Sequence, residues 1–167
     1  LIGAISALAA ANPKMLKKLF VSYDEASGIY GVLFFKCGGW EWVIVDDNVA
    51  VHEERSGYCY PLYASSGAEA ELWPMILEKA YAKMHYNWDI IDGGFAKEAL
   101  VDLTGGLERT YDLHREQKGM TFQQFRQEVD DPHTILGCAV GDHVQGDDSA
   151  VGGAGEAGAV FGLYHGH

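Results

Sequence analysis

The stretch from Glu71 to Lys83, ELWPMILEKAYAK, constrains the fold most, because it joins a helix start signal to helical periodicity. Pro74 suits the first helical turn, where its missing N–H group would be unpaired in any case. Behind it, five apolar residues recur at the spacing of one helix face: Ile76, Leu77, Ala80, Tyr81 and Met84. Glu78, Lys79 and Lys83 lie off that stripe. The pattern predicts an amphipathic helix with one face on a core.

The rest of the chain predicts short helices and short strands. The opening run, LIGAISALAA, is apolar and rich in small residues, which indicates a helix buried on several sides. Further helices are expected at 13–20, 96–103 and 121–129, and strands at 29–36, 41–45, 58–63, 107–113, 134–140 and 159–167. The glycines of Cys37-Gly38-Gly39 are expected to close a hairpin between the first two strands. Otherwise 48–66 is expected to be loop, and the glycine-rich stretch 141–159 a solvated loop.

Composition limits the class of protein. A length of 167 residues fits one domain, or one domain and part of another. A hydrophobic content of 48% with 12% aromatic residues is enough to bury a core. The formal net charge of −12 disfavours a nucleic acid or an anionic membrane as partner. Apolar runs stay well short of the roughly 20 residues that a membrane span needs.

The cysteines indicate reduced thiols in a cytosolic setting. Cys37, Cys59 and Cys138 are odd in number, far apart and without metal-site spacing. Cys37 stands in Cys-Gly-Gly-Trp, but a predicted strand follows it, so no helix dipole would stabilise its thiolate. Cys59 and Cys138 lie in apolar runs, where burial is expected to leave a thiol inert. None of the three is predicted to be a nucleophile.

Four pieces of sequence together resemble the calpain family of papain-like cysteine proteases: Trp73-Pro74, LEKAYAK at 77–83, Gly93-Gly94 and VDLTGG at 101–106. The resemblance implies an α+β fold, the papain-like protease core. Its helix-rich first subdomain would be residues 1–106, and its β-containing second subdomain, incomplete here, residues 107–167. The chain begins without Met and ends inside a predicted strand, so we expect it to be cut from a longer parent chain with other domains.

The resemblance also implies the positions of catalytic groups. In calpains a helix similar to the opening run follows a Cys-Trp pair, which would place the nucleophile two residues before Leu1. A helix N-terminus stabilises a thiolate there. Gly166-His167 is similar to the start of the family's Gly-His-Ala-Tyr motif, so His167 would be the catalytic base. Without the resemblance, the opening helix is an ordinary core helix. His165 and His167 alternate on a predicted strand and could equally bind a metal.

Two binding roles are implied in the same way. Gly93 and Gly94 are similar to the double glycine whose backbone pairs with extended substrate, although Asp92 replaces an expected serine. Asp-Gly alone would also predict a plain turn. Glu71 is similar to a carboxylate ligand of a calcium ion, which needs six to eight oxygen ligands. Its alternative role is an acidic residue near a helix N-terminus, favoured by the helix dipole.

The function implied is that of a calcium-dependent cytoplasmic cysteine endopeptidase acting on protein substrates, with the 167-residue chain itself inactive. In the family mechanism the thiolate attacks a peptide carbonyl, histidine protonates the leaving amine, and water releases the acyl-enzyme. Two alternatives stay open. A calpain-like domain without catalysis could act as a scaffold or protein-binding module, and an unrelated α+β binding domain would require the motif matches to be chance.

Overall fold

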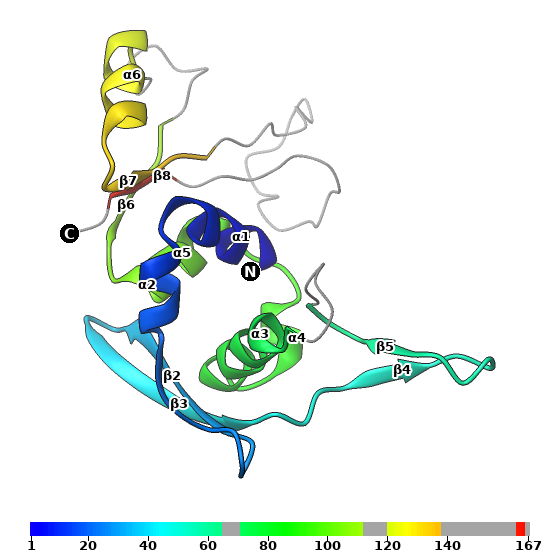
Figure 1. Cartoon of the computed structure of the whole chain (residues 1–167). Coiled ribbons are helices and arrows are strands. Elements are labelled where there is room, and N and C mark those ends of the chain that lie inside the picture. Colours follow the sequence, from blue (N-terminus) through cyan, green and yellow to red (C-terminus); the bar gives the residue numbers. More distant parts are fainter. Residues whose placement is uncertain (65–70, 112–119, 138–162, 166–167) are drawn as a thin grey trace.

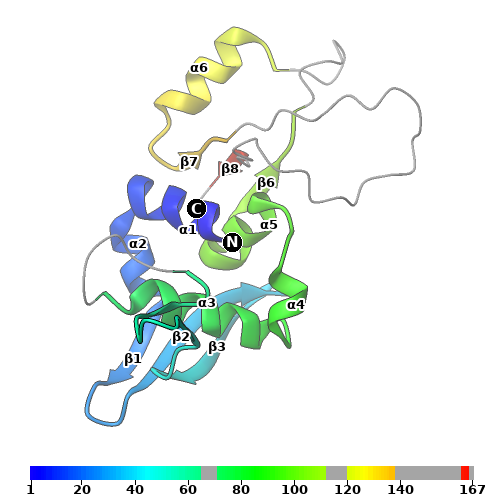
Figure 2. The ribbon, with the colours of Figure 1, turned by 90° about the vertical axis from the view of Figure 1, so that its right-hand side faces the viewer.

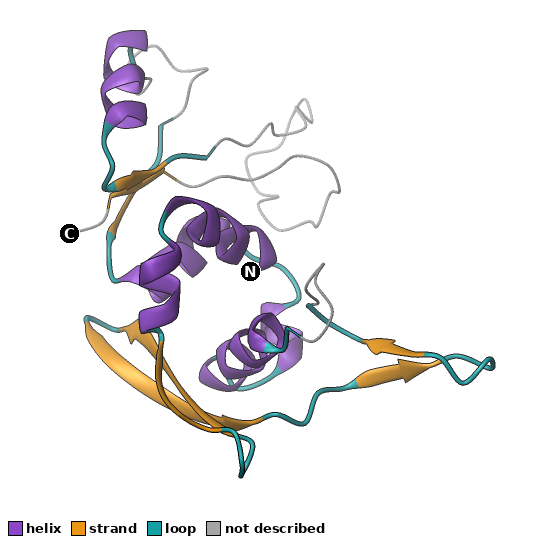
Figure 3. Cartoon of the chain, in the orientation of Figure 1, coloured by secondary structure: helices purple, strands orange, loops and turns teal. Residues whose placement is uncertain are grey.

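The computed structural model describes the chain at residues 1–64, 71–111, 120–137 and 163–165 (Figure 1). Its helices are α1 (Ile2–Ala11), α2 (Pro13–Lys18), α3 (Trp73–Met84), α4 (Trp88–Ile91), α5 (Ala96–Thr104) and α6 (Phe122–Asp130). Its strands are β1 (Phe20–Asp24), β2 (Ile29–Lys36), β3 (Gly39–Asp46), β4 (Val51–Glu53), β5 (Cys59–Pro61), β6 (Leu107–Arg109), β7 (Thr134–Ile135) and β8 (Leu163–His165). Helices and small antiparallel sheets coexist (Figure 3), so the predicted α+β class is confirmed and is consistent with part of a papain-like fold.

Asn12 and Pro13 separate the first two helices as their sequence predicts. Asn12 leaves helical geometry, and its side-chain Oδ1 accepts the N–H of Met15 at 3.1 Å, which caps α2. The predicted extension of α2 to Phe20 is wrong, because Phe20 begins β1 and pairs with Val32 of β2. Strand pairing therefore outweighs the helical preference of this short basic stretch.

The hairpin of β2 and β3 has the predicted position and a slightly different turn. The two strands pair antiparallel from Ile29↔Asp46 to Lys36↔Gly39. Positive φ values fall on Cys37 (51°) and Gly38 (85°), as a two-residue hairpin turn of this kind requires. Cys37, rather than a second glycine, thus takes one of the two left-handed positions.

The hydrophobic core lies between three helices and one face of the β1–β2–β3 sheet. α3 and α5 both pack against this sheet, and α1 packs on α5 (Figures 1 and 2). Fully buried residues of the core come from all of these elements: Leu8 of α1, Phe34 of β2, Leu77 of α3 and Leu100 of α5. Phe34 and Tyr81 pack edge to face, with ring centroids 5.7 Å apart.

The predicted apolar stripe of α3 is confirmed, with one addition. Ile76, Leu77, Ala80 and Tyr81 are buried and Met84 is half-buried. The addition is Glu78, which is also buried, and its Oε2 accepts the backbone N–H of Ala64 at 2.7 Å. A carboxylate tolerates burial when such a hydrogen bond satisfies it.

The β4–β5 hairpin projects from the body (Figure 1). Its register runs from Val51↔Pro61 to Glu53↔Cys59, and all three residues of β4 are exposed. The prediction of loop from 48 to 66 with one strand is wrong for β4. β5 lies within the expected strand at 58–63. Cys59 is exposed rather than buried, which corrects the expectation drawn from its apolar neighbours, because the hairpin lies outside the core.

A second small sheet lies between the core helices and α6 (Figures 1 and 2). Its strand order is β6–β8–β7, with β8 antiparallel to both neighbours. β6 ends at Arg109, and 110–111 of the predicted strand at 107–113 are not strand. β7 covers Thr134 and Ile135 of the predicted strand at 134–140, and 136–137 are not strand. The remaining positions of the two predicted strands, 112–113 and 138–140, lie outside the described residues. The glycine-rich stretch 141–159 lies outside the described residues. The division at Gly106 into two subdomains stays a prediction.

None of the helices in the described part of the chain combines the length and the apolar character that crossing a bilayer demands.

Candidate functional site

Gly93 and Gly94 lie on the exposed segment between α4 and α5. Their φ angles are +132° and +134°, a region that residues with a side chain rarely adopt. A Cβ atom added to either glycine would meet no heavy atom within 4 Å. The backbone is therefore open on the side where a side chain would stand. Its predicted pairing with an extended substrate is compatible with this geometry and stays a prediction.

Glu71 lies two residues before α3 and is exposed. Its Oε2 accepts the indole N–H of Trp73 at 3.3 Å. Across the described residues, no three His, Cys, Asp or Glu side chains come close enough together to hold a metal ion. Calcium takes six to eight oxygen ligands, so Glu71 can supply only one carboxylate of such a site. The calcium role of Glu71 therefore stays a prediction.

His167 lies outside the described residues, and so does its neighbour Gly166. The backbone of β8 ends just before them, at His165, which is the register partner of Leu107 on β6 and Thr134 on β7. The predicted catalytic role of His167 therefore stays a prediction. The expected strand is confirmed for the backbone from Leu163 to His165.

The described cysteines lack the setting of a nucleophile. Cys37 is an exposed residue of the β2–β3 turn, and Cys59 is an exposed residue of β5. Neither stands at a helix N-terminus, the position that stabilises a thiolate. Cys138 lies outside the described residues. α1 begins at Ile2, so the sequence-derived position of the nucleophile falls before the N-terminal turn of this helix.

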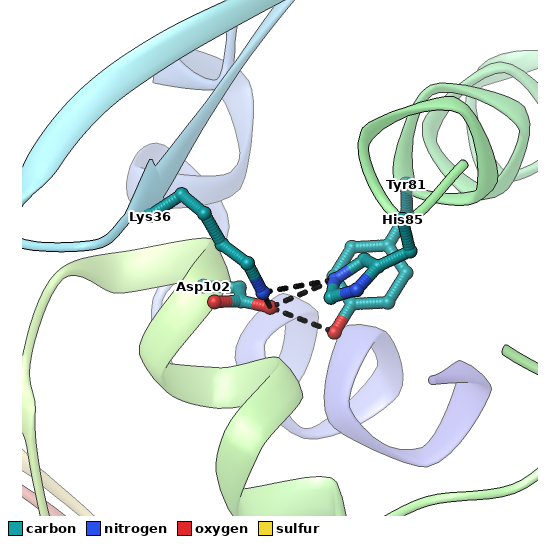
Figure 4. Close-up of polar contacts among 4 residues, drawn as sticks. All are labelled: Lys36, Tyr81, His85 and Asp102. Atoms are coloured by element: carbon teal, nitrogen blue, oxygen red, sulfur yellow. Dashed lines mark hydrogen bonds and ion pairs between the residues drawn. The ribbon is translucent and has the colours of Figure 1, made fainter. Parts of the chain in front are cut away.

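A polar cluster that the sequence did not predict joins three elements of the core (Figure 4). We call it the Asp102 cluster; its members are Lys36 at the end of β2, Tyr81 and His85 at the end of α3, and Asp102 on α5. Oδ2 of Asp102 accepts the hydroxyl of Tyr81 at 2.9 Å, lies 3.0 Å from Nε2 of His85, and accepts the ammonium of Lys36 at 3.3 Å. One carboxylate oxygen thus meets three donors.

Burial and charge define the chemistry of the Asp102 cluster. The side chain of Asp102 is 11% exposed and that of Lys36 is 34% exposed, so the pair is inside but next to solvent. Burial raises the pKa of the Tyr81 phenol, and the charge of Asp102 raises it further, which keeps the hydroxyl a donor. Nε2 of His85 lies 3.0 Å from Oδ2 of Asp102 and 3.4 Å from Nζ of Lys36. Because an ionised carboxylate only accepts hydrogen bonds, a bond between His85 and Asp102 requires the proton on Nε2.

Two sequence signals pointed toward this cluster. Tyr81 belongs to the apolar stripe, and a buried tyrosine hydroxyl requires a hydrogen-bond partner. Asp102 stands between Leu100 and Leu103, both fully or nearly fully buried, which places a carboxylate close to the inner face of α5. The partners could not be named, because Asp102 and Lys36 are 66 positions apart.

The segment from α3 to α5 has two further contacts that hold α4. The rings of Trp88 on α4 and Tyr63 stack with centroids 3.9 Å apart and an interplanar angle of 7°. The side chain of Asn87 accepts the N–H of Ile90 at 2.9 Å and so caps α4.

A cavity of about 500 Å³ lies between this region and β3, lined by Lys79, Lys83 and mainly apolar residues. Of the predicted site residues that the structure describes, Gly93, Gly94 and Glu71, none lines it.

Comparison with known proteins decides the family. The family model for calpain family cysteine proteases matches residues 1–167. The chain belongs to the calpain family. It is 42% identical over 95 residues to the calpain-type cysteine protease ADL1 of Oryza sativa subsp. japonica, covering 57% of this chain and 4% of the relative.

Two animal calpains give longer matches. Identity is 33% over 120 residues to Calpain-A of Drosophila melanogaster, which is 71% of this chain and 14% of the relative. It is 31% over 117 residues to the Calpain-2 catalytic subunit of Gallus gallus, which is 70% of this chain and 16% of the relative. The chain thus spans at most about a sixth of the length of these curated relatives. The resemblance drawn from four short motifs is confirmed.

Proposed function

We propose that this chain is part of the catalytic core of a calcium-dependent cysteine endopeptidase that cleaves protein substrates. The observation that carries the proposal is the match of the calpain family cysteine protease model along residues 1–167. The packing of α1 in the core, with its N-terminus starting at Ile2, supports it. A thiolate just before that turn would lie on the helix axis, where the backbone N–H groups favour negative charge.

In the proposed reaction, His167 takes the proton of the nucleophilic thiol, and the thiolate forms a bond to the carbon of the scissile carbonyl. The imidazolium returns the proton to the leaving amine as the C–N bond breaks. Water then attacks the thioester, with His167 as base, and releases the acid product. Gly93 and Gly94 hold the extended substrate through backbone hydrogen bonds, which their open surroundings permit.

Calcium enters the proposal through Glu71 alone. Its carboxylate would be one oxygen ligand, and the others would come from residues outside the described part of the chain. Titration of the full-length protein with calcium, monitored by calorimetry, tests this role of Glu71. Glu71→Gln is expected to weaken binding by about tenfold or more, because a neutral amide oxygen is a poorer ligand for Ca2+ than a carboxylate. Unchanged binding would remove Glu71 from the site.

A cytoplasmic location is proposed as well. Cys37 and Cys59 are both free and exposed, a state that a reducing compartment preserves. The acidic net charge of −12 gives no support to a nucleic acid as partner, so we propose proteins as the substrates.

Turnover of a fluorogenic peptide by the full-length protein tests the catalytic role. His167→Ala is expected to lower kcat on the order of 10⁴-fold or more, because the nucleophile loses its base. His165→Ala, two positions away, is the matched control and is expected to keep kcat within about tenfold. Equal losses in both variants would contradict the assignment. A wild-type protein that cleaves nothing would instead favour the scaffold alternative.

A further inference from the structure

We propose that the Asp102 cluster is a positioning device for the backbone of Gly93 and Gly94, and thereby for an extended peptide bound there. The inference rests on the proposed substrate role of the two glycines. It assigns Lys36, Tyr81, His85 and Asp102 to substrate positioning, although none of them touches the glycines. The ligand class is a peptide in extended conformation, recognised through its main chain.

The glycine pair needs an external positioning device. Neither Gly93 nor Gly94 has a neighbour within 4 Å of the point where a side chain would begin. Both are exposed, and glycine has the widest conformational freedom of any residue. Their own packing therefore cannot fix their position. It must come from the elements that carry the segment at either end.

The Asp102 cluster ties these two ends together. His85 is the C-cap of α3, directly before the segment 86–95, and Asp102 lies on α5, directly after it. The contact of 3.0 Å between His85 Nε2 and Asp102 Oδ2 joins the two ends across the segment. Tyr81 adds a second bond from α3 to the same oxygen, at 2.9 Å. Lys36 attaches this joint to the sheet at 3.3 Å.

The other described contacts of the segment involve residues on either side of the glycines rather than the glycines themselves. The stack of Trp88 on Tyr63 and the cap by Asn87 both act on α4, before the glycines. After the glycines, Phe95 is the N-cap of α5 and makes no side-chain cap hydrogen bond. The distance between α4 and α5, which the glycines must bridge, is thus set by the apolar packing of Ile91 and Ala96 on the core together with the joint where Asp102 meets α3.

A charged joint also suits positioning better than stability. A buried ion pair often stabilises no more than apolar residues of the same volume would, but it demands a defined geometry. Here three donors on two other elements must converge on one oxygen. Such a joint permits one arrangement of α3, α5 and β2.

The test uses the 167-residue protein and three variants. Asp102→Asn removes the charge at constant shape, His85→Ala removes one donor, and His85→Gln restores a side-chain N–H that can reach the carboxylate. Asp130→Asn is the matched control, since Asp130 forms an exposed ion pair with Arg126 on α6. Two readouts are taken by NMR. One is hydrogen exchange at Gly93, Gly94 and in α1; the other is titration with a capped hexapeptide of alternating threonine and valine, a composition that favours extended backbone.

We expect the peptide to shift the amide signals of Gly93 and Gly94 in the wild-type protein. Asp102→Asn and His85→Ala should speed exchange at the two glycines and raise the peptide Kd by about tenfold each, as the loss of a charge-assisted hydrogen bond implies. Exchange in α1 should stay within about twofold, and His85→Gln should recover most of the change. Asp130→Asn should change nothing beyond about twofold.

The outcomes separate the two proposals. A wild-type titration that leaves the signals of Gly93 and Gly94 unmoved overturns the substrate role of the glycines, and this inference with it. Normal peptide binding in the wild type, with Kd and glycine exchange unchanged in Asp102→Asn and His85→Ala, overturns the positioning role alone. Faster exchange in α1 to the same degree as at the glycines also overturns it, because the cluster would then only stabilise the fold.

Discussion

Helices α3 and α6 were both predicted from the sequence, yet they are held in opposite ways. α3 buries seven of its 12 residues and has no side-chain hydrogen bond at its N-cap, Leu72. α6 buries none of its nine residues and begins with a complete capping box between Thr121 and Gln124. α3 is therefore stabilised mainly by tertiary packing, whereas α6 is stabilised mainly by the hydrogen bonds of its N-terminal capping box.

The difference shows which of the two helices can hold functional side chains in a fixed geometry. α3 contributes Tyr81 and His85 to the Asp102 cluster and packs on β3 through its lysines. Lys83 Nζ donates to the carbonyl of Ile44 at 2.8 Å, and Lys79 forms an ion pair with Asp46. A helix held on several sides can keep polar groups in a defined geometry, whereas α6 has no comparable set of buried contacts among the described residues.

The largest expected effect compares a large apolar residue of each helix. Leu77 on α3 is 0% exposed, and Phe125 on α6 is 47% exposed. Leu77→Ala should lower the free energy of unfolding by about 3 kcal/mol through lost burial and a cavity. Phe125→Ala should lower it by about 0.5 kcal/mol or less. Urea unfolding followed by circular dichroism measures both, and similar losses would mean that α6 is packed as tightly as α3.

A middle-sized effect is expected where α5 ends beside the sheet. Gly105 has a φ of +72°, and a Cβ there would lie 2.9 Å from the Trp40 ring. Gly105→Ala should therefore lower the free energy of unfolding by about 2 kcal/mol, from backbone strain and crowding together. Gly38→Ala is the matched control, because Gly38 has a φ of +85° and open space around it. Thermal unfolding should show the smaller loss for Gly38→Ala; equal losses would exclude crowding.

The smallest effect concerns the helix ends. Thr121→Ala removes the capping box and should lower the free energy of α6 formation by about 1 kcal/mol. Leu72→Ala changes the N-cap of α3 without removing a cap hydrogen bond, so the amides of α3 should keep their protection. Hydrogen exchange of the two first turns is the measurement. Fraying of α3 but not α6 would reverse the comparison.

Local signals sufficed for most of the described elements. Pro74 and its apolar stripe predicted α3, and the expected helix at 96–103 agrees with α5, which ends at Thr104 before Gly105 takes a left-handed conformation. β4 was missed because its residues Val51–Glu53 are all exposed and show no alternation of apolar and polar positions. Its existence depends on pairing with β5, which no local pattern reports.

The candidate site likewise has a part that local sequence patterns predict and a part that they do not. The roles of Gly93, Gly94 and Glu71 were predicted from short motifs, because these residues stand in sequences that resemble those of the family, and these roles stay predictions. The Asp102 cluster was not predicted, since Asp102 and His85 are 17 positions apart and Lys36 lies 66 positions from Asp102. Convergence of this kind depends on how the helices dock on the sheet. Only the folded chain brings the three residues together.

A peptidase assay on the 167-residue protein tests the central claim most directly. We propose that the glycine backbone that binds the substrate and the catalytic base His167 lie within this chain, and that the nucleophilic sulfur lies outside it. Cys37 and Cys59 stand on a turn and a strand, where no helix terminus stabilises a thiolate. We therefore expect no turnover of a fluorogenic peptide, with or without calcium. Turnover that a thiol-alkylating reagent abolishes would contradict the account, because one of the chain's own cysteines would then be the nucleophile.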